Sequence, residues 1–232
     1  PDGKWVAAYY GIMAIGANTS LISDVPTSFE QLKDPKYKGL VTINGDPREA
    51  GAAFAAVMAA SLANGGSFDD IGPGIEYFAE LKALGNLVAN DVTEARVLSG
   101  ETALWLDWTY NYPGITPKLK ENGIELAIRV PTDGVYGGFY AQGAVAGSPN
   151  PNAAKLWVDH IISDEGALGY LEGGAIPARF EALVASGKVS EEAKKNLPAP
   201  ELIAQIKFPT PAQIKVAKDK LAAEWGPKVA DK

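Results

Sequence analysis

The side chains best placed for chemistry are acids next to aromatic rings in residues 100–112. Asp107 and Trp108 end an apolar run, and Tyr110 and Tyr112 follow shortly after them. Carboxylates accept hydrogen bonds from ammonium groups, and ring faces attract cations and cover methylene groups. The stretch therefore predicts a binding site for a small cationic solute. The alternative is a structural strand whose acid is solvated and whose rings pack in the core.

A second pair of acids lies in Asp46-Pro47-Arg48-Glu49, directly after a short predicted strand at 40–44. As local structure it reads as a helix start, with Asp46 as N-cap and Glu49 closing a capping box. Because a helix start that follows a strand faces the ligand crevice of an α/β sheet, both carboxylates could bind an ammonium group. Arg48 and the free N–H groups would instead favour an anion such as phosphate. The residues leave both chemistries open.

The elements that must position these groups alternate between strand and helix. Residues 102–106 predict a buried strand, whose carboxyl end would face the crevice. One or two further strands are predicted at 5–17, and single strands at 124–130 and 135–146. A short helix is predicted from an N-cap at Thr27 or Ser28, with Gln31 near the capping-box position, to its end at Asp34-Pro35. The other predicted helices cover 46–62, 69–84, 91–100, a stretch around Lys118, 152–162, 164–171 and, with breaks, 180–225. This order predicts an α/β fold with a largely parallel sheet and a lobe boundary near residues 131–134. Phe139, in the glycine-rich strand, adds another candidate ring.

Composition excludes several classes of function. The 232 residues contain no cysteine and carry a net charge of −7. Thiolate metal sites are therefore excluded, and the absence of a Lys/Arg cluster argues against nucleic acid. The chain lacks the motifs of common hydrolases and nucleotide enzymes, and its one histidine, His160, is predicted to be an ordinary helical residue. We expect neither an enzyme nor a cofactor; an enzyme or a sensory domain on the same fold is the competing class.

Three segments together resemble a known family. They are residues 10–18, Asp34-Pro-Lys-Tyr-Lys-Gly39 and Asp46-Pro-Arg-Glu49. This order resembles periplasmic solute-binding proteins of ABC transporters and is most similar to their spermidine/putrescine-binding branch. The similarity continues through Gly100-Glu101 to Trp108 and over residues 152–166. It implies a type II periplasmic-binding fold of two α/β lobes with mixed, largely parallel sheets. Residues 1–130 would be mainly the second lobe and 131–232 the return to the first lobe with the C-terminal helices, with the N-terminal part of that first lobe missing.

The resemblance also implies a role and a set of site residues. The role is solute capture outside the cytoplasm, in the periplasm or on a lipid anchor in a Gram-positive cell, in a cleft between the lobes. The partner would be the membrane permease of an ABC importer. The polyamine-binding acids of the family correspond to Asp46 and Glu49, its stacking Trp to Trp108, and a second cleft ring to Phe139. The family's strand acid that follows this ring is absent, and Asp107 is the candidate replacement.

Two other solutes fit members of the same superfamily. Ferric-ion-binding proteins place adjacent tyrosines just beyond this strand, and phenolate oxygen suits Fe(III). Tyr110 and Tyr112 are the candidates here, although only one of them is in register with that pair. A phosphorylated solute is favoured by Arg48 and the helix start. The predicted ligand-binding set is Asp46, Glu49, Asp107, Trp108, Tyr110 and Phe139.

Overall fold

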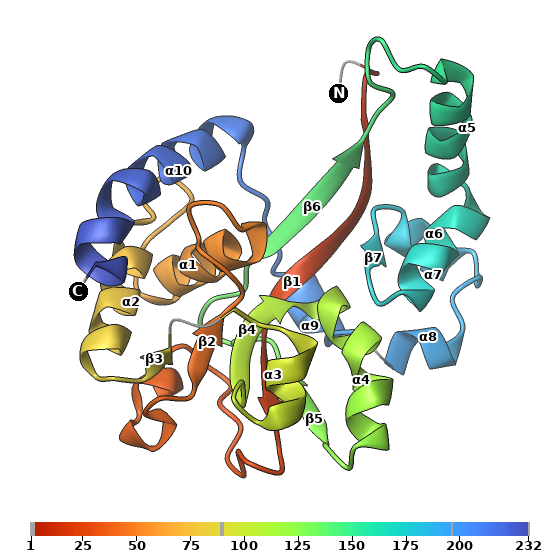
Figure 1. Cartoon of the computed structure of the whole chain (residues 1–232). Helices are drawn as coiled ribbons and strands as arrows, with labels where there is room; N and C mark the ends of the chain where they lie inside the picture. Colours follow the sequence, from red (N-terminus) through yellow and green to blue (C-terminus); the bar gives the residue numbers. More distant parts are fainter. Residues whose placement is uncertain (1–2, 89–90, 196, 232) are drawn as a thin grey trace. The chain divides into compact units, whose positions relative to one another are not determined.

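The computed structural model describes residues 3–88, 91–195 and 197–231 (Figure 1). The chain divides into two compact units, one made of residues 1–11 and 138–199 and the other of residues 12–137 and 200–232. Strands β1 (Val6–Asn18) and β6 (Gly137–Gln142) each pass from one unit into the other. The long first strand confirms the strand predicted at 5–17.

The larger unit is built on a mixed sheet. Its strand order is β3 (Leu87–Val88), β2 (Val41–Ile43), β4 (Leu104–Trp108), β1 and β5 (Leu126–Arg129). Strand β2 runs parallel to β3 and β4, whereas β1 runs antiparallel to β4 and β5. The predicted mixed α/β architecture is confirmed, with less parallel pairing than expected, because the long strand β1 enters the sheet between β4 and β5.

Helices cover both faces of this sheet (Figure 1). The main core joins the sheet to α1 (Gly51–Ala63), α2 (Gly72–Ala83) and α10 (Pro211–Trp225), and a second cluster joins it to α3 (Glu94–Ser99) and α4 (Tyr112–Glu121). Leu104 and Leu106 of β4 belong to the first cluster and Trp105 to the second. Since alternate residues of a strand point to opposite faces, Asp107 shares the face of Trp105, and Trp108 lies on the opposite face.

A glycine in β1 brings α4 close to the sheet. A Cβ atom on Gly16 would lie 2.2 Å from Cε1 of Tyr112, so any larger residue would collide with that ring. The Tyr112 ring lies 5.4 Å from Trp105, and its hydroxyl is within hydrogen-bond distance of the carbonyl oxygens of Ala14 and Trp105, at 3.0 and 3.1 Å. Tyr112 is therefore part of the core beneath α4.

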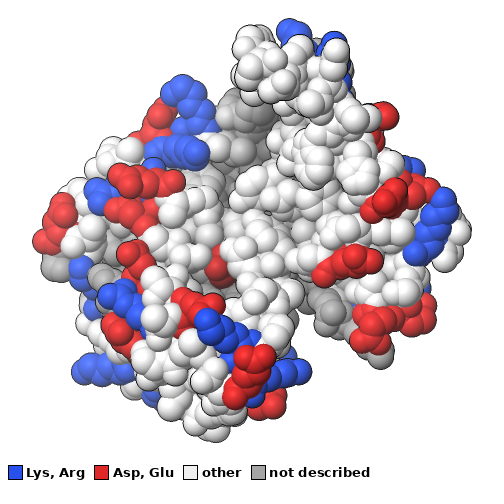
Figure 2. Space-filling model, turned by 45° about the vertical axis from the view of Figure 1, so that its right-hand side comes forward, with Lys and Arg blue, Asp and Glu red and all other residues white. Residues whose placement is uncertain are grey.

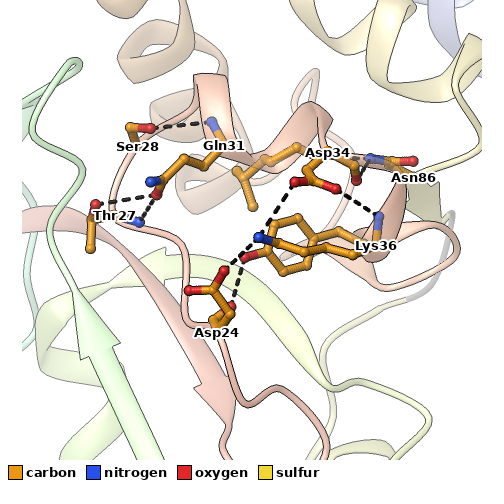
Figure 3. A network of polar contacts seen from close by, with 9 residues as sticks. Asp24, Thr27, Ser28, Gln31, Asp34, Lys36 and Asn86 are labelled. Atoms are coloured by element: carbon orange, nitrogen blue, oxygen red, sulfur yellow. Dashed lines mark hydrogen bonds and ion pairs between the residues drawn. The ribbon is translucent and has the colours of Figure 1, made fainter.

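Residues 30–37 form two short 3₁₀ helices, Glu30–Lys33 and Pro35–Tyr37, where one short helix ending at Asp34-Pro35 was predicted. Phe29 is the N-cap of the first 3₁₀ helix, without a side-chain capping bond. Just before it, the Gln31 backbone amide donates to Ser28 Oγ at 3.2 Å, and Gln31 Oε1 accepts from the Thr27 backbone amide at 2.7 Å (Figure 3). The break falls at Asp34, because a residue before proline disfavours helical backbone angles. Asn86 holds this segment by donating to the carbonyl oxygens of Leu32 and Asp34.

The smaller unit contains α5 (Pro151–Ile162), α6 (Asp164–Glu172), α7 (Phe180–Ala185) and α8 (Glu191–Lys195). Strand β7 (Ile176–Pro177) pairs with β1 at Tyr9 and Tyr10, and β6 also pairs with β1. Ser163 caps α6 by accepting from the Gly166 amide at 3.2 Å. The helices of this unit share a small core of Ala167, Leu171, Leu183 and Val189.

The C-terminal helices belong to the larger unit, which differs from the predicted division into residues 1–130 and 131–232. Both α9 (Pro200–Ile203) and α10 fall within it. The Trp225 ring packs edge-on against Phe78 of α2 at 5.8 Å, and Lys228 forms an ion pair with Glu76 at 2.5 Å. The boundary in the middle of the chain lies between residues 137 and 138, close to the predicted 131–134. The assignment of the units to a first and a second lobe stays a prediction.

Two element starts differ from the sequence predictions. Strand β4 covers 104–108 rather than 102–106, because Gly100 ends α3 in the left-handed conformation at φ +80° and the Thr102 amide donates back to Arg96. Helix α2 begins at Gly72 rather than Asp69, because Asp70 accepts from the Gly72 amide at 2.9 Å and forms a turn. The first shift moves Asp107 and Trp108 into the end of the strand.

Candidate functional site

The parallel pair β2 and β4 brings its carboxyl ends to one edge of the larger unit's sheet. Ile43 is opposite Leu106 in the register, so Asn44, which follows β2, lies beside Asp107 near the end of β4. The Asn44 side-chain amide donates to Asp107 Oδ2 at 2.8 Å. Ligands of open α/β sheets bind at this kind of edge, outside the carboxyl ends of the strands. The edge is therefore the candidate site within this unit.

Asp107 is buried, with 4% of its surface exposed. Its Oδ1 accepts from the Trp108 amide at 2.8 Å and from Asn111 Nδ2 at 2.7 Å, in addition to the Asn44 bond on Oδ2. Burial raises the pKa of Asp107 above its usual range, and these hydrogen bonds oppose the rise. All three donors are neutral groups. Among the described residues, no Lys or Arg contributes to this pKa shift, so the carboxyl group of Asp107 is buried without a cationic partner.

The carboxylate also orients two amides. Asn44 and Asn111 both turn their NH₂ groups toward Asp107, which directs their carbonyl oxygens away from it. An ionised carboxylate has about four acceptor positions, and three of those on Asp107 are used, which leaves one on Oδ2. The cluster can therefore offer acceptor oxygens to a donor-rich group. Sequence reasoning missed Asn44 and Asn111, although Asn44 is the last residue of the strand predicted at 40–44 and Asn111 lies between Tyr110 and Tyr112.

Trp108 lies in the main core rather than at an open surface. Its side chain belongs to the cluster with α1 and α2, and 5% of the residue is exposed. Its ring stacks on Tyr110 at 6.0 Å and contacts Tyr136 at 6.1 Å, while its indole N–H is buried without a hydrogen-bond partner in the described structure. Tyr110, in the 3₁₀ helix Thr109–Asn111, is half-buried and provides the more accessible ring of the stacked pair.

The iron alternative requires the phenolate oxygens of Tyr110 and Tyr112. Tyr112 is 1% exposed and its hydroxyl bonds to strand carbonyl oxygens, so burial raises the pKa of that hydroxyl well above its usual value. A phenolate ligand needs the opposite shift. Among the described residues no group of three or more His, Cys, Asp or Glu side chains could hold a metal ion. The position of Tyr112 therefore argues against a two-tyrosine iron site.

The stretch Asp46-Pro47-Arg48-Glu49 forms a turn and does not open a helix, which corrects the predicted capping box. Helix α1 begins at Gly51, and its N-cap residue Ala50 supplies no side-chain hydrogen bond. Asp46 instead accepts from the Arg48 backbone at 2.8 Å and binds its guanidinium at 3.0 and 2.6 Å. This ion pair holds the pKa of Asp46 below its usual range. The carboxylate of Asp46 is therefore already paired with the guanidinium of Arg48 in the same turn.

The two acids of this turn have different surroundings. Glu49 is exposed. Asp46 lines a pocket of about 370 Å³ within the larger unit, together with Lys82, Asp91, Arg96 and Trp225. The pocket therefore holds two acids and two bases. On the face shown in Figure 2, acidic and basic side chains are likewise interspersed, without a broad basic field.

Phe139 lies in the smaller unit, on β6, whereas the other predicted ligand-binding residues lie in the larger one. Its ring is 40% exposed and stacks on Trp5 at 6.0 Å. A cleft that would bring Phe139 together with Asp46, Glu49 and Asp107 stays a prediction. His160 is exposed on α5, with its ring 5.9 Å from that of Trp157, in agreement with an ordinary helical residue.

Comparison with known sequences identifies the family. Residues 1–206 match the family described as bacterial extracellular solute-binding protein. A relative described as an uncharacterized protein of Haemophilus influenzae is 30% identical over 186 residues, which cover 75% of this chain and 50% of the relative. The chain thus spans about half the length of the curated relative that it matches.

Solved structures with the same fold bind different solutes. The periplasmic binding protein AfuA of Actinobacillus pleuropneumoniae, with fructose-6-phosphate bound, has a TM-score of 0.66 at 22% identity, and the match covers 98% of this chain and 69% of AfuA. Iron-bound HitA of Pseudomonas aeruginosa has a TM-score of 0.66 at 23% identity, and the match covers 96% of this chain and 69% of HitA. The spermidine/putrescine substrate-binding protein PotD of Streptococcus pneumoniae has a TM-score of 0.65 at 13% identity, and the match covers 97% of this chain and 69% of PotD. At these identities the likeness shows the type II periplasmic-binding fold alone, and the family match shows that the chain belongs to the bacterial extracellular solute-binding proteins.

Proposed function

We propose that this chain is part of the solute-binding component of an ABC importer, which captures a small polar solute outside the cytoplasm and delivers it to a membrane permease. The family match supports this role. Across the described ranges no helix is both long and apolar enough to cross a bilayer. Such a component works in the periplasm or on a lipid anchor, and it does not catalyse a reaction.

The proposed solute is polyamine-like and carries at least one ammonium group. The observation that carries this proposal is Asp107, a buried carboxylate at the strand edge with only neutral donors around it. Burying an unpaired charge is costly, and a cation supplied by the solute would compensate it. The oriented amides of Asn44 and Asn111 offer further acceptor oxygens to an ammonium group, which has three donors and no acceptor.

Charge and ring surface near this edge agree with a cation. Asp46, Glu49 and Asp107 carry three negative charges and Arg48 carries one positive charge, so these four groups have a net charge of −2. The Tyr110 ring, backed by Trp108, offers a face to a cation or to the methylene groups between two amines. Phe139 would contribute a second ring from the smaller unit.

A phosphorylated solute is the second candidate. Helix α1 has 13 residues and no side-chain cap, and a Cβ added at Gly51 would meet nothing within 4 Å. The uncapped N–H groups and the helix dipole favour an anion at this position. Arg48 is bound to Asp46, so a phosphate would have to compete for its guanidinium. Because of this competition, and because Asp46, Arg48, Glu49 and Asp107 together are negatively charged, a phosphorylated solute fits the site less well than a cationic one.

A thermal-shift panel on the full-length protein tests the proposal. The compounds are putrescine, spermidine, Fe(III) and fructose-6-phosphate. A ligand at 100 times its Kd stabilises the native state by about 2.7 kcal/mol, which corresponds to roughly 5–10 °C for a chain of this size. We expect a shift with the two amines. A shift with Fe(III) or the sugar phosphate but not with the amines would overturn the cation assignment, and no shift with any of the four would contradict the polyamine proposal and both of its rivals.

A further inference from the structure

The carboxylate of Asp46 has no acceptor position left for a solute. It accepts from the Arg48 backbone amide at 2.8 Å and from the Arg48 guanidinium in three further contacts, two from Nε at 3.0 and 3.1 Å and one from Nη2 at 2.6 Å. An ionised carboxylate has about four acceptor positions, so Arg48 alone uses all of them. A solute ammonium group can pair closely with Asp46 only after the guanidinium has given up some of these contacts. Binding of a cation at Asp46 therefore requires a second partner for Arg48.

Asp231 is placed to be that partner. A Cβ atom added at Gly226 would lie 3.0 Å from Asp231 Oδ2 and 3.5 Å from Arg48 Nη1, so both groups face one point beside Gly226. Nη1 is the guanidinium nitrogen that makes no hydrogen bond to Asp46. Among the described residues, the Asp231 carboxylate forms no ion pair of its own. The carboxylates of Asp46, Asp231 and Glu49 raise the pKa of Arg48, which places Asp231 within electrostatic reach of the guanidinium.

The backbone that carries Asp231 is anchored to the larger unit. Asp231 follows the π-helical turn η4 (Gly226–Ala230), which packs on α2. From α2, Lys82 Nζ donates to the last two carbonyl oxygens of this turn at 2.6 and 3.3 Å, and the Asp231 amide donates to its first carbonyl oxygen at 2.9 Å. Val229, within the turn, is buried. The carboxylate of Asp231 is therefore held beside Arg48.

A change of partner by Arg48 requires little free energy. The side chains of Arg48 and Asp46 are 38% and 35% exposed, and exposed ion pairs contribute little net stability. An ammonium group and a guanidinium at one carboxylate repel each other, because both carry a positive charge. A second carboxylate nearby removes the guanidinium from this repulsion and keeps it paired. A neutral solute brings no charge that could replace the guanidinium at Asp46.

We propose that Asp231 is a positioning residue of the solute site, which accepts the guanidinium of Arg48 when an ammonium group of the solute binds the carboxylate of Asp46. The inference rests on the proposed binding of a cationic solute at this edge of the sheet. It adds that Asp46 exchanges one cation for another, so that the edge selects solutes with a positive charge. Asp231 itself does not touch the solute and acts through Arg48.

Asp46→Asn tests the change of partner without any solute, because it removes the charge that holds the guanidinium. We expect the carboxyl carbon resonance of Asp231 to shift in NMR spectra of the full-length Asp46→Asn protein, since the guanidinium then pairs with this carboxylate. The shift should be absent from the double variant Asp46→Asn/Arg48→Ala. It should also shrink when Gly226→Ala is added, because the new methyl group occupies the point that both groups face. Gly226 has φ −51° and ψ −68°, so alanine fits its backbone.

Isothermal titration calorimetry with spermidine tests the link to binding. Asp231→Asn and Gly226→Ala should each raise the Kd of the full-length protein about two- to fivefold, the effect of one exposed ion pair. Asp219→Asn is the control, because it removes the same charge from an exposed ion pair with Lys215 on α10, and it should leave the Kd unchanged. Saturating the parent protein with spermidine should shift the Asp231 carboxyl resonance in the same direction as Asp46→Asn.

The outcomes separate this inference from the proposed function. If spermidine binds the parent but Asp231→Asn and Gly226→Ala leave its Kd unchanged, or if the Asp231 resonance moves in neither experiment, the role of Asp231 is wrong and the cationic solute stands. If neither amine binds the parent, the proposed function and the role of Asp231 fall together. Tighter binding of fructose-6-phosphate by Asp231→Asn would assign Arg48 to an anionic solute and overturn both.

Discussion

Replacing Asp107 by Asn tests both the packing and the proposed chemistry of the strand edge. The buried carboxylate accepts three hydrogen bonds at 2.7 to 2.8 Å from Asn44, Trp108 and Asn111. An amide has one acceptor oxygen, so its NH₂ group must face at least one of these donors. An unsatisfied buried donor costs about 1–3 kcal/mol, and removal of the buried charge offsets part of this cost. We expect a net loss of about 1–2 kcal/mol in unfolding free energy, or about 2–8 °C in Tm.

The same substitution should weaken binding of an amine more than it lowers stability. A hydrogen bond between charged partners contributes about 1.5–3 kcal/mol, so the Kd for putrescine and spermidine should rise roughly 10- to 150-fold. Isothermal titration calorimetry on the full-length protein measures the Kd, and thermal unfolding measures the Tm. Asp219→Asn is the control, because Asp219 forms an exposed ion pair with Lys215 at 2.5 Å on α10. It should leave the Kd unchanged and the Tm within about 2 °C of the parent.

The pH dependence of stability follows from the direction of the pKa shift. Burial raises the pKa of Asp107 above the unfolded value, so its contribution is fully present below that value and is lost as pH rises through the folded pKa. The stability advantage of the parent over Asp107→Asn should therefore be largest below the ordinary pKa of an aspartate and shrink as pH rises through the folded pKa. An unchanged Kd together with the expected drop in Tm would show that Asp107 acts in packing alone. An unchanged Tm would refute the three-bond network.

Three further predictions concern the core and the turn before α1. Gly16→Ala places a Cβ 2.2 Å from the Tyr112 ring and should cost about 1–3 kcal/mol in urea unfolding; the cost should be smaller in a Tyr112→Ala background, and equal costs would contradict the contact. Tyr112→Phe should cost about 0.5–1.5 kcal/mol without changing Fe(III) binding, whereas loss of Fe(III) binding at unchanged stability would contradict its burial. Arg48→Ala should raise the pKa of Asp46 in an NMR titration, because the guanidinium of Arg48 lowers that pKa in the folded protein. The ion pair therefore stabilises the fold above the unfolded pKa of Asp46, and this stabilisation is lost as pH falls through the folded pKa. An unchanged titration of Asp46 would refute the ion pair.

The local elements were largely predictable, and the errors fall where side chains compete for backbone groups. The apolar, β-rich composition of residues 5–17 predicted strand where β1 lies, and the turn residues 148–152 predicted the start of a helix where α5 lies. The predicted capping box at Asp46 and Glu49 was wrong. The Asp46 carboxylate binds the backbone and the guanidinium of Arg48, and helix α1 begins only at Gly51. The stop predicted at Asp34-Pro35 lies between the two 3₁₀ helices, but the N-cap of the first one is Phe29 rather than Thr27 or Ser28.

By itself, the amino-acid sequence determined the alternation of strands and helices, the mixed α/β class and the edge at which Asp107 lies, since these depend on local pattern and on the direction of neighbouring strands. The tertiary structure alone decided which side chains share that edge. It decided that Trp108 packs in the main core with α1 and α2, buried Tyr112 against Gly16, and joined the C-terminal helices to the larger unit. Each of these outcomes depends on contacts between residues far apart in the chain, and a one-residue change of register reverses the face of every side chain in a strand.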